Sequence, residues 1–529
     1  MPVLELTGRT RNRDRSALGF DGASTWNATS HNCARSPVAA RLSSLIEGLD
    51  GAVLTGTDCA VIDATHDSRQ VVPGALFCAV PGQALDGHDF AADAGAAGAA
   101  ACLVERPLAL DLPQIVVPSV REAMGPIAAR IHGSPSSELR MLGVTGTNGK
   151  TTVTCFLEAA MAAAGWGSSR IGTLGSRLHG RNEGFPRTTP EATDLQRMLR
   201  SLRTRGADGV AMEVSSHGLD LHRVDGIVFD VAAFTNLTQD HLDWHLTIER
   251  YRAAKARLFT PELSRHAVLL LDAPGTREML PLVDVPLTTI GTTTDADVHV
   301  RERLVHADGS QVRFELDGID LHATTVMRGA HNLDNLLVAI VTAVRAGIDA
   351  ETVISALASV PAPEGRMEPF GGGDAPLVLV DYAHTPDAIT AAVSVGRSLL
   401  SGNASLHAVL GAGGDRDRDK RALMGEAAAN ADHVIITDDN PRSEDPDAIR
   451  AAILAGARGG AATIVDCGDR ASAIQQAIMN AEAHDVVLVL GRGHEMHQEV
   501  RGEFRPLDDR QIVRDALDRR GQVARECAE

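Results

Sequence analysis

A glycine-rich loop constrains this chain more than any other feature. It reads Gly-Val-Thr-Gly-Thr-Asn-Gly-Lys-Thr-Thr over residues 143–152, between a strand-like run at 141–144 and a helix predicted over 153–164. Gly146 and Gly149 let the backbone turn, so that successive N–H groups and the positive end of the helix dipole face phosphate oxygens. In this pattern Lys150 reaches the β- and γ-phosphates and the Thr151 hydroxyl binds magnesium. The sequence therefore predicts a nucleotide-binding α/β domain.

One position departs from the general phosphate-loop pattern. Val144 stands where that pattern has glycine, which argues against an ordinary kinase or GTPase loop. The alternative interpretation is a glycine turn that only caps a helix, but the Lys-Thr pair in register favours phosphate binding. We expect the whole loop to contact ATP through Gly146, Thr147, Asn148, Gly149, Lys150, Thr151 and Thr152.

Chain length and strand spacing indicate several domains. At about 150 residues each, 529 residues predict three or four. We expect a disordered leader at 1–40, a first domain at 41–137, a central domain at 138–361 and a third at 362–529. In the third, apolar runs at 377–380, 407–410, 434–437, 463–465 and 486–490 alternate with helical stretches. Such alternation predicts a Rossmann-like parallel sheet covered on both faces, so the fold class is α/β throughout.

Composition excludes several classes of protein. The net charge of −19 and an aromatic content of 3% disfavour a nucleic-acid binder, which needs basic and stacking surfaces. The seven cysteines have no metal-ligand spacing, which is typical of thiols in a reducing compartment. No apolar run reaches the length of a membrane span, and no signal peptide precedes the first domain. We therefore expect a cytoplasmic protein without membrane insertion, with a disordered leader favoured over an organelle transit peptide.

Two polar segments follow predicted strands of the central domain. Glu213 lies near the carboxyl end of the strand-like run 209–213, where open α/β sheets bind ligands and where Mg²⁺ favours a carboxylate. The run 227–234 leads into a loop with Asp240, His241, Asp243 and His245. Taken alone, a glutamate at a strand end is more often a helix cap or an ion-pair partner, and a loop of this kind is more often a solvated turn. The nearby phosphate loop favours a catalytic site.

Together these segments resemble a known family. TGTNGKTT at 145–152, EVSSHGL at 213–219 and TNLTQDHLDWH at 235–245 are similar to the Mur ligases, the ATP-dependent amide-forming enzymes of peptidoglycan precursor synthesis. Folylpolyglutamate synthases share the outline. The resemblance covers about residues 55–520 and implies three domains, with a central P-loop ATPase-type parallel sheet and a Rossmann-like C-terminal domain.

The resemblance implies a catalytic site and further ATP contacts. Lys255 fits the family's carbamylated lysine, although a helical lysine is more often simply solvated. The implied catalytic residues are Lys150, Glu213, His241 and Lys255, and the implied magnesium ligands are Thr151, Glu213, His241 and carbamylated Lys255. Further ATP contacts are implied for Asn332, Asn335, Arg366, Asp381 and His384. For the two asparagines a helix cap is a compatible second interpretation.

Other segments resemble the substrate-binding parts of the third ligase in the pathway. His-Asp-Ser-Arg at 66–69 and Arg-Thr-Thr-Pro at 187–190 imply that a UDP-muramoyl dipeptide binds Ser68, Thr188, Thr189, Ser215 and Arg223. Two positions depart from the common pattern. Arg187 stands where Asn is frequent, and Leu221 stands where Gln is frequent.

The stretch Asp-Asp-Asn-Pro-Arg-Ser-Glu-Asp at 438–445 resembles the amino-acid-selecting motif of ligases that add meso-diaminopimelate. That substrate carries an ammonium and carboxylate pair at its distal end, which L-lysine lacks, and a guanidinium can hold a carboxylate through two hydrogen bonds. A turn that starts a helix is the alternative interpretation. The implied diaminopimelate contacts are Arg416, Asp439, Asn440, Arg442, Gly491 and Glu495.

The resemblance therefore implies an acid–amino-acid ligase. ATP would phosphorylate the D-glutamyl γ-carboxylate of UDP-N-acetylmuramoyl-L-alanyl-D-glutamate, and an amine of meso-diaminopimelate would displace the phosphate, with Mg²⁺ as cofactor. We expect a monomer whose domains close on these small-molecule substrates. The alternatives are the same ligase acting on L-lysine, or a phosphate-loop NTPase without ligase activity.

Overall fold

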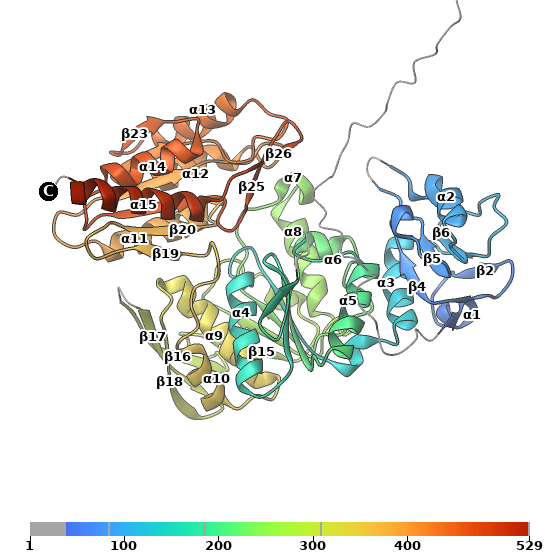
Figure 1. Cartoon of the computed structure of the whole chain (residues 1–529). Helices are drawn as coiled ribbons and strands as arrows, with labels where there is room; N and C mark the ends of the chain where they lie inside the picture. Colours follow the sequence, from blue (N-terminus) through green and yellow to red (C-terminus); the bar gives the residue numbers. More distant parts are fainter. Residues whose placement is uncertain (1–38, 83–84, 184–186, 307–308, 527–529) are drawn as a thin grey trace, which may run out of the picture.

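The computed structural model describes residues 39–82, 85–183, 187–306 and 309–526, so the expected leader at 1–40 lies almost wholly outside the described residues. Three lobes follow one another along the chain, each built on its own sheet (Figure 1). The N-terminal lobe lies beside the central one in this view, while the C-terminal lobe lies above the central lobe on its other side. The α/β fold class predicted from the sequence is confirmed.

The N-terminal sheet has five strands in the order β2-β7-β6-β5-β4. The strands from β4 to β7 run parallel to one another. The strands are β2 (Val53–Thr55), β4 (Asp63–Thr65), β5 (Ala75–Cys78), β6 (Ala101–Val104) and β7 (Gln114–Val116), with β2 antiparallel. α3 (Val120–Ile131) packs its buried aliphatic side chains against one face, and α2 (Ala91–Ala96) covers the other. Smaller elements are β1 (Ala40–Arg41), α1 (Leu42–Leu45) and β3 (Ala60–Val61).

The central sheet has eleven strands, and its parallel part holds the phosphate loop. The parallel strands, in spatial order, are β9 (Ser168–Gly172), β12 (Gly209–Glu213), β8 (Arg140–Thr145), β13 (Val231–Phe234), β14 (Ala267–Leu270), β15 (Leu287–Gly291) and β16 (Val298–His306). Antiparallel strands extend both edges, β10 (Gly175–Leu178) and β11 (Arg181–Glu183) on one side, β17 (Gly309–Leu316) and β18 (Ile319–Thr325) on the other. The predicted strand 227–234 is shorter than expected, since it begins at Val231.

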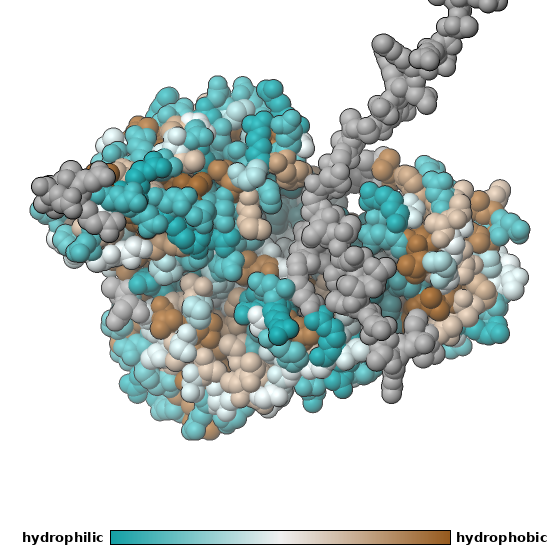
Figure 2. Space-filling model, in the orientation of Figure 1, coloured by the Kyte–Doolittle hydropathy of each residue, from teal (hydrophilic) through white to brown (hydrophobic). Residues whose placement is uncertain are grey.

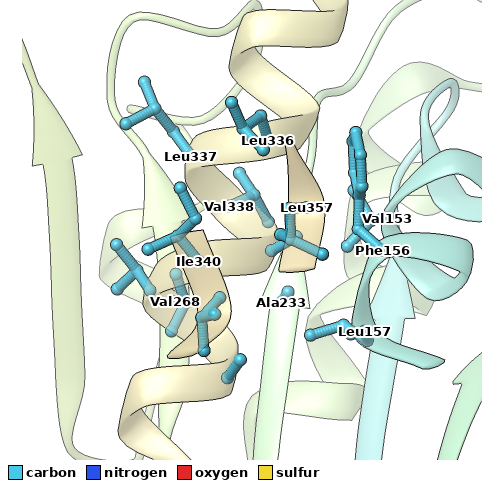
Figure 3. Packing of buried hydrophobic residues seen from close by; sticks show 14 of the residues in the cluster. Val153, Phe156, Leu157, Ala233, Val268, Leu336, Leu337, Val338, Ile340 and Leu357 are labelled. Carbon is cyan, nitrogen blue, oxygen red and sulfur yellow. The ribbon is translucent and has the colours of Figure 1, made fainter. Parts of the chain in front are cut away.

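Helices cover both faces of this sheet. α4 (Lys150–Ala163), α9 (Ala330–Arg345) and α10 (Ala350–Leu357) bury Val153, Phe156, Leu336 and Leu357 in one apolar layer (Figure 3). On the other face lie α5 (Ala192–Thr204), α6 (Ser216–Asp220) and α8 (Ile248–Ala256), and α7 (Leu242–His245) contacts α8. This packing fixes the amino ends of α4 and α9 beside each other.

The C-terminal sheet matches the five predicted runs and adds one strand. Its order is β19 (Glu368–Gly371), β20 (Leu377–Asp381), β24 (Val486–Leu490), β21 (Leu406–Leu410), β22 (His433–Ile436) and β23 (Thr463–Asp466). β19 was not predicted, and it pairs antiparallel with β20 at the edge. The covering helices are α11 (Pro386–Leu399), α12 (Lys420–Ala428) and α13 (Pro446–Ala457) on one face, α14 (Arg470–Asn480) and α15 (Asp509–Glu526) on the other. A hairpin of β25 (His497–Val500) and β26 (Glu503–Pro506) follows β24.

The hydropathy of the visible surface differs between the C-terminal and N-terminal lobes. The visible face of the C-terminal lobe is mostly hydrophilic, whereas hydrophobic side chains gather on the N-terminal lobe (Figure 2). Exposed apolar side chains of that lobe include Val53 and Val72. Within the described residues, no helix is long and apolar enough to cross a bilayer.

Candidate active site

The phosphate loop joins β8 to α4, and its two central glycines are required by geometry. Gly146 and Gly149 have φ of 149° and 90°, a region that L side chains rarely adopt. A Cβ at Gly146 would lie 1.9 Å from the Thr235 hydroxyl oxygen, and one at Gly149 would lie 2.3 Å from Asn335 Oδ1. α4 begins at Lys150 rather than at the predicted residue 153, so the helix amino end lies directly at the loop.

The segment after β13 supports this loop. The Asn236 carbonyl accepts a hydrogen bond from Thr147 N (2.9 Å), and Asn236 Oδ1 accepts one from Asn148 N (2.9 Å). The Thr235 hydroxyl donates to the Asn148 carbonyl at 2.6 Å. Thr235 and Asn236 therefore hold the loop open for a ligand, a role that the sequence interpretation missed although both residues belong to the quoted motif.

Two lysines share one acceptor beneath the loop. Lys150 Nζ donates to the carbonyls of Gly146 and Thr147, both at 2.9 Å, and Lys255 Nζ donates to the Gly146 carbonyl at 2.8 Å. Lys255 is 1% exposed and lies 4.5 Å from the Tyr251 ring centroid. Burial lowers the pKa of Lys150, and burial together with the charge of Lys150 lowers the pKa of Lys255 well below its ordinary value.

Glu213 lies at the end of β12 and His241 lies in the segment that follows β13, as expected. Glu213 closes β12 and accepts hydrogen bonds from the Thr173 amide and hydroxyl, both at 3.0 Å. His241 has φ of 54° at the start of α7, and burial lowers its pKa to about 3. The Thr151 hydroxyl accepts a hydrogen bond from Arg366 at 3.2 Å. Among the described residues, no three His, Cys, Asp or Glu side chains form a ready metal-binding cluster.

These groups nevertheless fit a hard cation in type. The Thr151 hydroxyl and the Glu213 carboxylate supply the oxygen atoms that Mg²⁺ prefers, and a carbamate on Lys255 would supply more. Lys255 forms no ion pair with an acidic side chain within the described part of the chain, although it is buried beside a second cation. Converting this ammonium into a carbamate anion would replace a repulsion with an attraction.

A cavity of about 1070 Å³, including its open mouth, lies between the central and C-terminal domains next to the phosphate loop. Leu270, Ala273, Val338 and Ala391 form part of an apolar wall. The predicted ATP contacts that line it are Asn148, Gly149, Thr152, Asn332, Asn335, Arg366 and Asp381, whereas His384 and the other loop residues do not. Neither asparagine caps α9, because the cap residue is Gly329 and both side chains lie within the helix.

Side chains of the C-terminal domain contact the central domain at this cavity. The Arg366 guanidinium lies 4.6 Å from the Tyr382 ring centroid while it reaches Thr151. Asp240 is paired with Lys420 Nζ at 3.3 Å and with His384 Nε2 at 3.7 Å. Burial alone would raise the pKa of Asp240, but the nearby imidazoles of His384 and His241 and the charge of Lys420 hold that pKa well below its usual range.

The residues predicted for the UDP-dipeptide form one hydrogen-bonded group in the central domain. The Thr189 hydroxyl donates to the Glu213 carbonyl and accepts from Ser215 N, both at 3.0 Å. Arg223 donates to the Thr189 carbonyl at 3.2 Å. The Thr188 hydroxyl lies 3.0 Å from that of Thr173, which in turn contacts Glu213. This network connects the predicted substrate loop to the predicted catalytic carboxylate.

Ser68 lies apart from this group, on the N-terminal domain in a short 3₁₀ turn. The link between the two domains runs through residues that the sequence interpretation missed. His66 Nδ1 lies 3.0 Å from the Thr193 hydroxyl, and Glu191 pairs with Arg121 (2.6 Å) and Arg223 (2.8 Å). Burial would raise the pKa of Glu191, but these guanidinium groups lower it. Glu191 directly follows the Thr-Thr-Pro segment at 188–190, and this position was the signal that could have identified it.

Two loops of the C-terminal domain bring the predicted amino-acid contacts together. The Gly414 amide donates to the Asn440 carbonyl at 2.9 Å, and Arg442 Nη1 donates to the Gly414 carbonyl at 2.7 Å. Arg442 has φ of 51°, and its Nε lies 3.3 Å from Glu499 Oε2. Arg416 is exposed on the first of these loops. The 438–445 stretch leads directly into a helix, as the alternative interpretation expects, because α13 begins at Pro446 with Asp445 as its N-cap, while Asp439, Asn440 and Arg442 lie in the loop before it.

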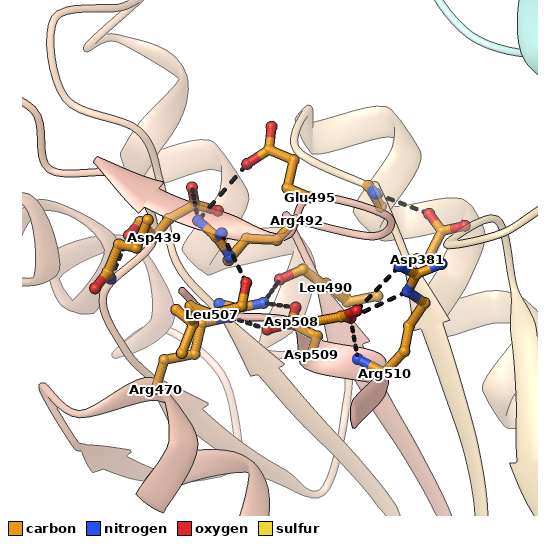
Figure 4. Close-up of polar contacts among 12 residues, drawn as sticks. Asp381, Asp439, Arg470, Leu490, Arg492, Glu495, Leu507, Asp508, Asp509 and Arg510 are labelled. Carbon is orange, nitrogen blue, oxygen red and sulfur yellow. Dashed lines mark hydrogen bonds and ion pairs between the residues drawn. The ribbon is translucent and has the colours of Figure 1, made fainter. Parts of the chain in front are cut away.

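The remaining predicted contacts surround one buried guanidinium. Asn440 Nδ2 donates to Glu495 Oε2 at 2.8 Å, and Asp439 approaches Gly491 so closely that a Cβ there would lie 2.7 Å from Asp439 Oδ2. Arg492 lies between them with a side chain that is 0% exposed (Figure 4). The sequence interpretation missed Arg492, although it lies between the predicted contacts Gly491 and Glu495. Burial and the charge of Asp439 raise the pKa of Glu495.

Family models match three parts of the chain. They are described as the Mur ligase family catalytic domain (residues 64–132), the Mur ligase middle domain (144–343) and the Mur ligase glutamate ligase domain (365–493).

Similar proteins cover nearly the whole chain. A UDP-N-acetylmuramoyl-L-alanyl-D-glutamate–2,6-diaminopimelate ligase of Streptomyces coelicolor is 41% identical over 90% of this chain and 96% of its own length. The protein of the same name from Corynebacterium efficiens is 42% identical over 84% of this chain and 87% of its own. A solved structure of a ligase of this name, 31% identical, gives a TM-score of 0.66 over 92% of this chain and 100% of that one. A folylpolyglutamate synthase from Mycobacterium tuberculosis complexed with ADP, 20% identical over 69% of this chain and 90% of its own, shares the fold with a TM-score of 0.57. The chain therefore belongs to the Mur ligase family of ATP-dependent ligases.

Proposed function

We propose that this chain joins meso-diaminopimelate to the D-glutamyl γ-carboxylate of UDP-N-acetylmuramoyl-L-alanyl-D-glutamate, with ATP converted to ADP and phosphate. The relatives of about 40% identity have this activity in their names. As ATP and UDP-linked precursors are cytoplasmic metabolites, we place the reaction in the cytoplasm.

One observation carries the proposal. The Gly491 amide donates to the Asp381 carbonyl at 3.0 Å, across the adjacent strands β24 and β20. Asp381 lines the nucleotide cavity, and Gly491 begins the loop that holds Glu495. A nucleotide site and a site with paired acidic and basic side chains therefore share one wall, as a ligase that transfers an activated acyl group to an amino acid requires.

The electrostatics of the second site favour an amino acid with a charged distal end. Arg416 and Arg442 supply guanidinium groups for a distal carboxylate, while Asp439 and Glu495 supply carboxylates for a distal ammonium. L-Lysine would leave the guanidinium groups without a carboxylate partner, which costs free energy when the site closes. The site is therefore better matched to diaminopimelate than to lysine.

The residues around the phosphate loop would activate the acyl donor. The loop amides, Lys150 and Arg366 would bind the ATP phosphates, and Thr188, Thr189 and Arg223 would present the dipeptide carboxylate to the γ-phosphate. Mg²⁺ bound by Thr151, Glu213, His241 and a carbamate on Lys255 would supply charge neutralisation. The carboxylate oxygen attacks the γ-phosphorus, ADP leaves, and the amine then displaces phosphate from the acyl phosphate. Catalysis thus rests on positioning and electrostatics.

The carbamate on Lys255 has its own test. Native mass spectrometry should show one carbon dioxide adduct that is absent from Lys255→Arg, since a guanidinium does not form a carbamate. An unmodified Lys255 in active protein would contradict this assignment and leave the amide-forming reaction itself untouched.

The reaction is tested by measuring ADP release and UDP-tripeptide formation with each substrate omitted in turn. We expect both products only when ATP, the UDP-dipeptide and meso-diaminopimelate are all present. Arg442→Ala should raise the KM for diaminopimelate with little effect on the KM for ATP. Phosphate release that needs neither the dipeptide nor an amine would contradict the proposal and support an NTPase without ligase activity.

A further inference from the structure

Arg492 is a fully buried cation next to the proposed amino-acid site. Its side chain is 0% exposed, and it lies on the loop that follows β24. Nη1 donates to Asn440 Oδ1 at 2.9 Å, and Nη2 donates to the carbonyls of His497 (2.6 Å) and Leu507 (3.3 Å). A buried guanidinium is costly unless its environment compensates it, so its position requires these acceptors.

The two carboxylates of the site complete its surroundings. Asp439 Oδ1 lies 3.8 Å and Glu495 Oε2 lies 3.6 Å from Arg492 Nη1 (Figure 4). At these distances Arg492 offsets the repulsion between two acidic groups on one wall. Without Arg492, the two carboxylates would have no ion pair with any cation among the residues that the structure describes.

Arg492 also sets the orientation of the Asn440 amide. Asn440 Oδ1 accepts from Arg492 and from the Glu499 amide, both at 2.9 Å, so a flipped amide would present its NH₂ to two donors. The unflipped amide directs Nδ2 to Glu495 at 2.8 Å. An amide nitrogen has two N–H groups, so one remains for a substrate carboxylate.

We propose that Arg492 is a positioning residue for amino-acid selection: it fixes the Asn440 amide and the Glu495 carboxylate in the arrangement that distinguishes diaminopimelate from lysine. This inference rests on the proposed function. It assigns no contact between Arg492 and the substrate, because the guanidinium lies behind the residues that would touch it.

A matched control lies in the same domain. Arg470 is also 0% exposed, and it pairs with Asp509 at 2.7 Å and donates to the Leu490 carbonyl at 2.9 Å. It forms no hydrogen bond with Asn440 or Glu495 within the described residues. Arg470→Met therefore removes a buried guanidinium of the same kind without releasing the Asn440 amide.

The test compares Arg492→Met, Arg492→Lys and Arg470→Met in the full-length chain. For Arg492→Met we expect the KM for meso-diaminopimelate to rise about tenfold or more, the KM values for ATP and the UDP-dipeptide to change less than about twofold, and the preference for diaminopimelate over L-lysine to fall. Arg492→Lys keeps the charge but loses the forked geometry, so it should recover part of the preference. Arg470→Met should lower the melting temperature and leave the preference unchanged.

Two outcomes would overturn the inference. One is a preference for diaminopimelate over L-lysine that is the same in Arg492→Lys as in the unaltered chain. This comparison tests the inference even if Arg492→Met does not fold. The other is an equal loss of preference in Arg470→Met, which would show general loosening of the domain. If the unaltered chain makes no product with diaminopimelate, the proposed function fails instead, and the two failures are thereby distinguished.

Discussion

The ion pair between Asp240 and Lys420 should couple ATP use to the contact between the central and C-terminal domains. The two side chains come from different domains, are 4% and 7% exposed, and approach to 3.3 Å. Coulomb attraction at this distance is about 5 kcal/mol at an effective dielectric constant of about 20. Removing the lysine also removes its desolvation cost, and His384 stays near Asp240 at 3.7 Å. We therefore expect a net coupling of about 2 kcal/mol.

A double-mutant cycle measures this coupling directly. Lys420→Met, Asp240→Asn and the double variant are compared by kcat/KM for ATP at saturating dipeptide and diaminopimelate. Lys420→Met should lower kcat/KM about thirtyfold, and the double variant should lose much less than the product of the two single losses. Additive effects within about 0.5 kcal/mol would refute the reasoning, because the pair would then contribute nothing to the domain contact.

Three further predictions concern the loop, the amino-acid site and stability. Gly149→Ala forces a Cβ to 2.3 Å from Asn335 Oδ1 at a φ of 90° and should raise the KM for ATP more than tenfold. The control Gly165→Ala, at a φ of 78° with open space around it, should cost only about 1–2 kcal/mol of stability. Equal KM values for ATP in the two variants would contradict this prediction. Burial raises the pKa of Glu495 above the ordinary 4.5, so this group becomes protonated at a higher pH than a usual glutamate. The KM for diaminopimelate should therefore rise as the pH falls toward that pKa, while the KM for ATP stays level. Parallel changes in the two KM values would argue against this role of Glu495. Arg470→Met leaves the carboxylate of Asp509 buried without its partner, so the free energy of unfolding measured by urea titration should fall by about 3–5 kcal/mol. A loss below about 1 kcal/mol would be inconsistent with a buried ion pair.

The local motifs predicted the centre of the site well. Gly146, Gly149 and Glu213 lie where the strand and loop patterns placed them, because residues close in sequence determine a strand–loop–helix unit. The third-domain strands were predicted for the same reason, since buried parallel strands are continuous aliphatic runs.

What the sequence could not predict depends on contacts between distant residues. Arg492 is a basic residue in a polar segment, and only the fold buries it against Asn440, 52 residues away. Asp240 and Lys420 form an ion pair although 180 residues separate them in the sequence, and a local sequence pattern does not reveal a pair so far apart. The positive φ of Arg442 likewise belongs to a contact between distant residues, since the Arg442 amide donates to the Glu499 carbonyl.

A competition experiment tests the central claim most directly. Equal concentrations of meso-diaminopimelate and L-lysine are supplied with ATP and UDP-N-acetylmuramoyl-L-alanyl-D-glutamate, and the UDP-tripeptide is identified by mass. The account predicts that nearly all product contains diaminopimelate, with one ADP formed for each amide. Product that contains mainly lysine, or ADP formed without any amide, would contradict it.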